Sequence, residues 1–182
     1  MSIKNSYFSK YTIQEYLLGL LRFFFGFEFL WAFLDKFFGL GIGTAPENSF
    51  LAGAPLTEGY LSFVTNPNSP FAFVFNGPDA LLVQLGFFVD LAYLGMLLVG
   101  GVTLISGIGV RIGGLSTFIF FFSVWLATFP PANNPFIEAH FLQMWILLFF
   151  VISNSGYWLG FGERWHNFLE SRVDPRIAKV FQ

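Results

Sequence analysis

Long apolar stretches, separated by short polar or glycine-rich segments, dominate this chain. A helix needs about 20 mostly apolar residues to cross a bilayer, and four stretches reach or approach that length. They are predicted at residues 16–40, 87–106, 112–129 and 136–153, the second with a possible extension back to Ala80. The pattern therefore predicts an all-α integral membrane protein, a four-transmembrane-helix bundle that forms a single membrane domain over residues 1–182.

Glycine and proline residues mark the ends of these predicted helices. Gly107 and Gly109 indicate a tight turn between the second and third helices, and Pro130-Pro131 ends the third. Pro135 is suited to open the fourth helix. Small residues that favour close helix contact over ligand binding recur at Gly95, Gly100, Gly101, Gly109, Gly113 and Gly114.

The connection between the first and second helices, residues 41–78, is long, since links within bundles mostly have about 2–8 residues. It is rich in aromatic and aliphatic residues, which argues against a disordered loop. We expect an outer cap that is partly helical, with short helices around residues 57–64 and 70–75. The segment 162–182 is polar and is predicted to form a helical tail at the cytoplasmic membrane surface.

The positive charges predict an orientation. Lys36 lies at the far end of the first apolar segment, and the other eight Lys/Arg residues fall on the opposite side, at Lys4, Lys10, Arg22, Arg111, Arg164, Arg172, Arg176 and Lys179. Because such residues concentrate on the cytoplasmic side, both termini are predicted to be cytoplasmic in a multi-pass protein of the cell (plasma) membrane. No cleavable signal peptide is evident.

Composition limits the chemistry that the chain can perform. The net charge of −2 gives no basic surface for nucleic acid. The expected partners are a lipid bilayer and a partner membrane or extracytoplasmic subunit. The absence of cysteine excludes disulfides, thiolate metal sites and iron–sulfur ligation on this chain. No metal, haem or flavin is predicted here, and no nucleotide-binding or hydrolase motif occurs.

Polar residues gather near the predicted outer ends of all four helices. Glu28, Trp31 and Asp35 follow one another at spacings of three and four, so they share a helix face. Lys36 is expected to form an ion pair with Asp90 or Glu138. The other members of this group are Trp125, Asn133, Asn134, His140 and Gln143.

Each of these residues also has a simpler interpretation. Lys36 can extend its ammonium group to the membrane interface, and the tryptophans can serve as interfacial anchors. His140 can be a hydrogen-bonded histidine at a helix start. Glu28 is either a proton-bearing site or a buried structural hydrogen-bond donor, because a charge near mid-membrane is costly.

Several segments resemble the DoxX/DoxD family. They are residues 30–41 (Leu-Trp-Ala-Phe-Leu-Asp-Lys-Phe-Phe-Gly-Leu-Gly), 53–61, 125–127, 130–136 and 138–140. The likeness extends from about residue 21 to 165 and implies a four-helix membrane fold. The DoxD branch is a subunit of a thiosulfate:quinone oxidoreductase, so the resemblance implies quinone as cofactor. The family positions carried over are Trp31, Asp35, Lys36, Trp125, Asn134, Pro135 and His140.

Two functions follow as hypotheses. In the first, a quinone lies between the helices, with Lys36 or His140 hydrogen-bonded to its oxygen and Asp35 or Glu138 relaying protons. Trp31, Trp125, Asn134 and Asp90 would then help to bind it, and a partner would supply the redox centre. In the second, the chain is a non-catalytic structural or assembly subunit of a larger membrane complex. A small transporter is disfavoured because inverted repeats and broken helices are not evident.

Overall fold

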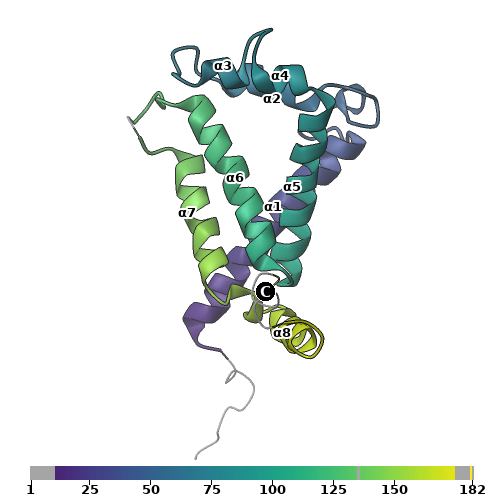
Figure 1. Cartoon of the computed structure of the whole chain (residues 1–182), viewed down its shortest axis with the longest axis vertical. Coiled ribbons are helices and arrows are strands. Elements are labelled where there is room, and N and C mark those ends of the chain that lie inside the picture. Colours follow the sequence, from purple (N-terminus) through teal and green to yellow (C-terminus); the bar gives the residue numbers. More distant parts are fainter. Residues whose placement is uncertain (1–10, 135, 175–180, 182) are drawn as a thin grey trace, which may run out of the picture.

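A computed structural model describes residues 11–134, 136–174 and 181, and within that part of the chain all regular structure is helical (Figure 1). Lys4, Lys10, Pro135, Arg176 and Lys179 lie outside the described residues. The helices are α1 (Ile13–Phe38), η1 (Pro46–Asn48), α2 (Leu56–Val64), α3 (Ala72–Phe75), α4 (Leu81–Leu85), α5 (Phe87–Ser106), α6 (Val110–Thr128), α7 (Ala139–Ile152), η2 (Ser155–Tyr157) and α8 (Gly162–Glu170).

The long helices pack in the order α1, α5, α6, α7, each mainly on the next. The short helices α2, α3 and α4 lie across one end, whereas the start of α1 and α8 lie at the other (Figure 1). Three helices, α1, α5 and α6, are long and apolar enough to cross a membrane, and α7 is apolar but has only 14 residues. The described part of the chain is therefore all-helical, with three candidate membrane spans and a capped end.

The core lies where α1, α5, α6 and α7 meet, and aromatic rings fill much of it. Phe29 of α1 contacts Phe121 of α6, with ring centroids 5.4 Å apart, and Phe25 meets Phe150 of α7 edge-on at 6.0 Å. Such offset and edge-on geometries are favourable for aromatic pairs. The remaining buried members of this cluster are Tyr93, Leu97, Leu104, Val110, Met144 and Leu147.

Most helix limits match the sequence-based predictions. The limits of α5 are those predicted, and α2, α3 and α8 occupy the predicted short helices. Helix α1 begins earlier than predicted because Thr12 and Glu15 form a capping box: the Thr12 hydroxyl accepts from the Glu15 N–H, and the Glu15 carboxylate accepts from the Thr12 N–H. It ends at Phe38 because Gly39 adopts a left-handed conformation at the cap.

One possible extension does not form and one helix begins later than expected, each for a local reason. Helix α5 does not extend back to Ala80, since Gly86, with φ of 42°, separates it from α4. Helix α7 begins at Ala139 and not at residue 136, because Asn134 Oδ1 accepts from the N–H groups of Phe136 and Ile137 and holds them outside the helix. The Glu138 side chain then caps the helix by accepting from the N–H of Phe141.

Glycine residues allow the long helices to approach one another, as predicted. A Cβ atom at Gly101 of α5 would lie 2.7 Å from the backbone nitrogen of Leu30 on α1, and one at Gly26 would lie 2.7 Å from the backbone nitrogen of Ile105. The same holds between α6 and α7, where a Cβ at Gly114 would meet a Val151 methyl group. Close approach lets helices gain dispersion contacts that lipid cannot replace.

Arg22, one of the bases predicted to lie on the cytoplasmic side, is fully buried. Its guanidinium donates to the carbonyl oxygens of Leu104 and Ile105, in the last turn of α5, and to that of Trp158 at 2.8 Å. These carbonyls belong to a helix end and to an irregular segment, so they have no intrahelical donors. Arg22 thus joins α1, α5 and the segment before α8 at the end opposite the cap.

Candidate functional site

The polar residues predicted to form one constellation are divided by the structure into separate groups. Asp35 and Lys36 lie at the end of α1 beside the first loop. Asp90 lies in the first turn of α5 and is bonded to α2. Glu138 and His140 lie at the start of α7. The side chains are therefore engaged by different local partners.

Asp35 is only 4% exposed, and the loop after α1 folds over it. Its Oδ2 atom accepts from the backbone N–H of Gly43 at 3.1 Å, and among the described residues no donor reaches Oδ1. A Cβ at Gly43 would lie 3.0 Å from Oδ2, so the absence of a side chain there brings the backbone close to the carboxyl group. Asp35 therefore fixes the loop to the end of α1.

Lys36 is half-buried and borders a polar cavity of about 920 Å³, which we call the outer basin. The outer basin lies among the first loop, α2 and the segment after α3, and its other polar lining residues are Thr44, Asn48, Glu58, Tyr60, Ser62 and Asn76. Lys36 forms no ion pair with any described residue. The predicted pairing with Asp90 or Glu138 is wrong, because both carboxylates are occupied by donors nearer in space.

Asp90 is buried and holds the start of α2 against α5. Its Oδ1 atom accepts from the backbone N–H of Thr57 at 2.8 Å and from the Thr57 hydroxyl at 2.6 Å. A carboxylate at a helix N-terminus satisfies an N–H group that has no intrahelical acceptor, and it also favours the helix dipole. Asp90 also borders a cavity of about 330 Å³, the middle cavity, together with Thr57, Glu58 and Gly86.

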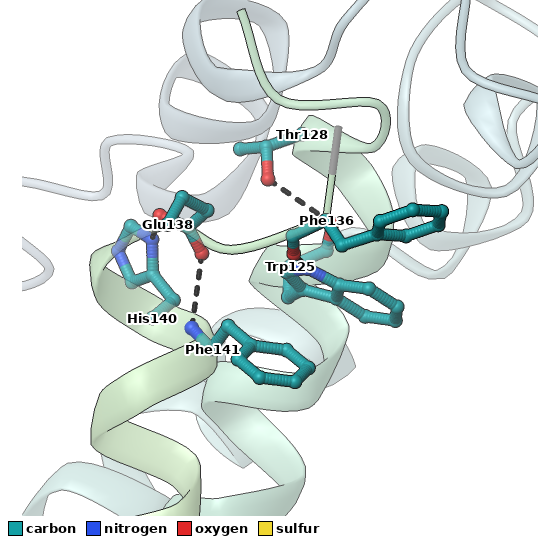
Figure 2. Close-up of polar contacts among 6 residues, drawn as sticks. All are labelled: Trp125, Thr128, Phe136, Glu138, His140 and Phe141. Atoms are coloured by element: carbon teal, nitrogen blue, oxygen red, sulfur yellow. Dashed lines mark hydrogen bonds and ion pairs between the residues drawn. The ribbon is translucent and has the colours of Figure 1, made fainter. Parts of the chain in front are cut away.

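Glu138 and His140 interact directly at the start of α7 (Figure 2). Glu138 Oε2 lies 2.8 Å from His140 Nδ1, while Oε1 accepts from the N–H of Phe141 at 3.1 Å. The His140 ring also packs on Phe121 with centroids 5.5 Å apart. The Glu138 carboxylate therefore both caps the helix and orients the imidazole. His140 is thus a hydrogen-bonded histidine at a helix start, the simpler of the two interpretations that the sequence allowed.

Trp125 and Asn134 hold the loop between α6 and α7. The Trp125 indole N–H donates to the carbonyl oxygen of Phe136 at 3.0 Å, and its ring packs on Phe141 with centroids 5.6 Å apart (Figure 2). Asn134 accepts from the N–H of Ile137 at 3.0 Å. Both side chains stabilise the turn that leads into α7. Glu138 and Asn134 also border a surface hollow of about 720 Å³ beside the end of α2.

Two further residues of the predicted face of α1 point away from this interior. Trp31 is exposed and stacks on Phe27, with centroids 6.3 Å apart. Glu28 is also exposed on the protein surface, yet it lies close enough to His140 for an electrostatic interaction. Both side chains therefore face outward, and Trp31 does so as an interfacial anchor would.

An apolar cavity of about 350 Å³ lies between α5 and α6 beneath α2. Its size falls within the range of small-molecule sites, about 300–1,000 Å³. Phe88 is 73% exposed at its rim, and Leu85 and Ala92 are exposed as well, so the cavity opens on the apolar outer face of the helices. Its interior is lined by Thr57, Tyr60, Leu61, Phe75, Tyr93, Met96, Phe120 and Val124.

Four residues that carry hydroxyl groups border this apolar cavity: Thr57, Tyr60, Tyr93 and Ser123. Burial raises the pKa of Tyr60 above its ordinary value, and the Glu138 carboxylate raises it further. The Tyr60 hydroxyl therefore stays a neutral hydrogen-bond donor throughout the physiological pH range. Tyr93 is buried in α5 and borders the same cavity.

None of the eight residues selected from the sequence as catalytic or cofactor-binding borders the apolar cavity, although Asp90 is one hydrogen bond away through Thr57. Thr57, Tyr60 and Tyr93, which border this cavity, were not selected from the sequence. A spacing of three places Thr57 and Tyr60 on one face of α2, and Asp90 and Tyr93 on one face of α5. That spacing was a usable signal, but the meeting of the two faces depends on how the cap folds.

Among the described residues, no group of three or more histidine and carboxylate side chains is placed to hold a metal ion. Comparison of the chain with protein-family models, curated proteins and solved structures finds no match. The resemblance to the DoxX/DoxD family thus rests on the sequence segments quoted above, and function must be argued from the residues and the cavities.

Proposed function

We propose that this chain is a four-transmembrane-helix protein of the plasma membrane, similar to the DoxX/DoxD family, that binds quinone as a subunit of a quinone-dependent oxidoreductase such as a thiosulfate:quinone oxidoreductase. The observation that carries the proposal is the apolar cavity between α5 and α6. It is open toward the face that lipid would cover, and residues that carry hydroxyl groups border it.

Membrane topology follows from the apolar helices and the positive charges. Helices α1, α5 and α6 have the length and composition of spans. Helix α7 is about 21 Å long at 1.5 Å per residue, so it would cross with local thinning of the bilayer and with help from the apolar residues Phe136 and Ile137 before it. Arg111 and Arg164 lie at the α8 end, which makes that end, with both termini, cytoplasmic in this proposal.

A quinone suits the apolar cavity better than a polar metabolite does. Its ring would pack against Phe120 and Tyr93, and the Tyr60 hydroxyl would donate to a quinone oxygen. The isoprenoid tail would leave between Phe88 and Met96 into the bilayer. This arrangement moves the ligand away from Lys36 and His140, where the sequence had suggested it.

Electron transfer needs a second component in this proposal. The described residues include no cysteine and no cluster for a metal ion, and the chemistry of quinone reduction requires a donor of two electrons. The outer surface of the cap offers a place for a partner, because Phe63 is 87% exposed there and Phe73 is exposed nearby. The same feature favours the second candidate function, a non-catalytic structural or assembly subunit.

Binding of quinone to the purified protein tests the proposal. Decylubiquinone and menadione would be titrated into protein in lipid nanodiscs, and a quinone carried through purification would be extracted and identified. Ala92→Phe places a bulky ring at the mouth of the cavity on an exposed site, so we expect it to weaken binding by about tenfold or more, which corresponds to about 1.4 kcal/mol.

Leu91→Phe is the matched control, because Leu91 is the exposed neighbour on α5 and does not border the cavity. Its affinity should equal that of the wild type. If the wild type binds neither quinone, or if Ala92→Phe binds as tightly as Leu91→Phe, the cavity is not a quinone site. Isolation of a stable complex without quinone would then favour the structural role.

A further inference from the structure

Helix α2 separates three cavities, and single residues border two of them at once. Thr57 borders the apolar cavity and the middle cavity, while Glu58 borders the middle cavity and the outer basin. Asp90 borders the middle cavity and is bonded to Thr57. Side chains that carry oxygen atoms thus border each of the three cavities, and one hydrogen bond, between Thr57 and Asp90, joins two of them.

We propose that Thr57 and Asp90 form a proton relay between a hydroxylated ligand in the apolar cavity and the solvent on the outer side. This inference rests on the proposed quinone site, and it assigns a route for the protons that a quinone takes up and a quinol releases. The relay requires a donor-acceptor side chain next to a carboxylate, and the structure holds the two at 2.6 Å.

The transfer balances without any change in oxidation state. A ligand hydroxyl donates to Thr57 Oγ1 and its O–H bond breaks as the proton moves to that oxygen. The original Thr57 proton passes along the existing hydrogen bond to Asp90 Oδ1, where a new O–H bond forms. The carboxylate becomes a neutral carboxyl group and then releases the proton to the middle cavity; the reverse sequence protonates the ligand.

The backbone keeps this pair in position. The N–H group of Thr57 donates to the same Oδ1 atom at 2.8 Å, so the carboxylate oxygen is held by both the main chain and the side chain of one residue. Both residues are buried, which limits competition from solvent for the short hydrogen bond. The geometry is therefore present before a ligand arrives.

The titratable groups around the relay are carboxyl groups that border the middle cavity and tyrosine hydroxyls that border the apolar cavity. Glu58 of α2 faces the middle cavity with Asp90 of α5, and Tyr60 and Tyr93 face the apolar cavity. No Lys, Arg or His is among the described residues that border either cavity; Lys36 borders only the outer basin beyond them. A proton that reaches Asp90 thus meets a second acceptor, Glu58, toward solvent.

The experiment uses the full chain in nanodiscs with a 2-hydroxy-3-alkyl-1,4-naphthoquinone, whose absorbance changes when its hydroxyl ionises. Equilibrium titration gives affinity, and a stopped-flow pH jump gives the rate at which bound probe changes protonation. We expect Thr57→Val and Asp90→Asn, each measured at probe concentrations that saturate its own titration curve, to slow that rate by about tenfold or more. Thr57→Ser, which keeps the hydroxyl, should restore the wild-type rate.

Thr65→Val is the matched control, since the Thr65 hydroxyl at the end of α2 donates to the Leu61 carbonyl and takes no part in the relay. It should exchange protons at the wild-type rate. Equal rates in Thr57→Val, Thr65→Val and wild type would overturn the relay while leaving the binding site intact. Failure of the wild type to bind the probe would instead overturn the proposed function, and the relay with it.

Discussion

The contact between α1 and α5 makes a sharp prediction about glycine. These helices form the largest interface in the fold, and Gly101 lies where a Cβ atom would be 2.7 Å from the backbone nitrogen of Leu30 and 2.8 Å from its Cα. Ordinary contact begins at 3.4 Å, so Gly101→Ala requires the helices to separate by about 0.7 Å (3.4 − 2.7). The atoms that the new methyl group would clash with belong to the backbone, which cannot move away by changing rotamer as a side chain can.

The expected magnitude is the difference between two opposing terms. Overpacking of this kind costs about 1–3 kcal/mol, and the higher helix propensity of alanine returns up to about 1 kcal/mol. Gly101→Ala should therefore lower the free energy of unfolding by about 1–2 kcal/mol. Gly95→Ala is the matched control on the same helix, because a Cβ there meets nothing within 4 Å, and it should be neutral or slightly stabilising.

Unfolding in mixed micelles of dodecylmaltoside and sodium dodecyl sulfate, followed by circular dichroism, measures both variants. Gly26→Ala should behave like Gly101→Ala, since its Cβ would lie 2.7 Å from the Ile105 nitrogen in the same interface. In the double variant, the free energy of unfolding should fall by less than the sum of the decreases in the two single variants, because one separation of the helices relieves both contacts. If Gly101→Ala is as stable as Gly95→Ala, the packing argument is wrong.

Three other predictions concern single side chains. Arg22→Met should lower the free energy of unfolding by about 3 kcal/mol in the same assay, because the carbonyls of Leu104 and Trp158 lose their donors; an unchanged value would contradict this. Glu138→Ala should weaken α7 by about 1 kcal/mol through loss of its N-cap and should speed hydrogen exchange at its first turn, which exchange measurements would show. Tyr60 should ionise above the ordinary tyrosine pKa of about 10, so the stability that it contributes is present below that pH and is lost as pH rises through the higher folded pKa. The difference between the alkaline absorbance titrations of wild type and Tyr60→Phe checks this, and a titration centred at or below pH 10 would refute it.

The helices could be predicted from the sequence because they depend on local patterns. The apolar stretch 87–106 is bounded by Gly86 and Gly107, whose positive φ values end the helix where the sequence indicated. The start of α1 was also encoded locally, since Thr-x-x-Glu before an apolar stretch indicates a capping box. The predicted helix limits were least accurate where a side chain accepts hydrogen bonds from backbone N–H groups just before a helix, as Asn134 does before α7.

The polar partners could not be predicted in the same way, because they depend on contacts between distant residues. Lys36 and Asp90 lie at the same end of the fold, as the sequence indicated, but charge alone does not determine which groups meet. Asp90 accepts from Thr57, 33 positions away, because α2 begins beside α5 and offers an unpaired N–H group together with a hydroxyl. A neutral donor at 2.6 Å that costs little to desolvate therefore replaced the ion pair expected from formal charge.

This choice of partner also explains why the outer cap has a defined structure. An apolar connection at the membrane surface could lie in the lipid interface without contacting the helices. Here the Thr57–Asp90 bonds fix the start of α2, and Leu61 and Phe75 bury their side chains against Ala127 of α6. The cap is thereby held across α5 and α6 and roofs the cavity between them. The same hydrogen bond that positions the roof thus lies at the boundary between the apolar cavity and the outer side, so a substitution at Asp90 should change access to the cavity as well as cap stability.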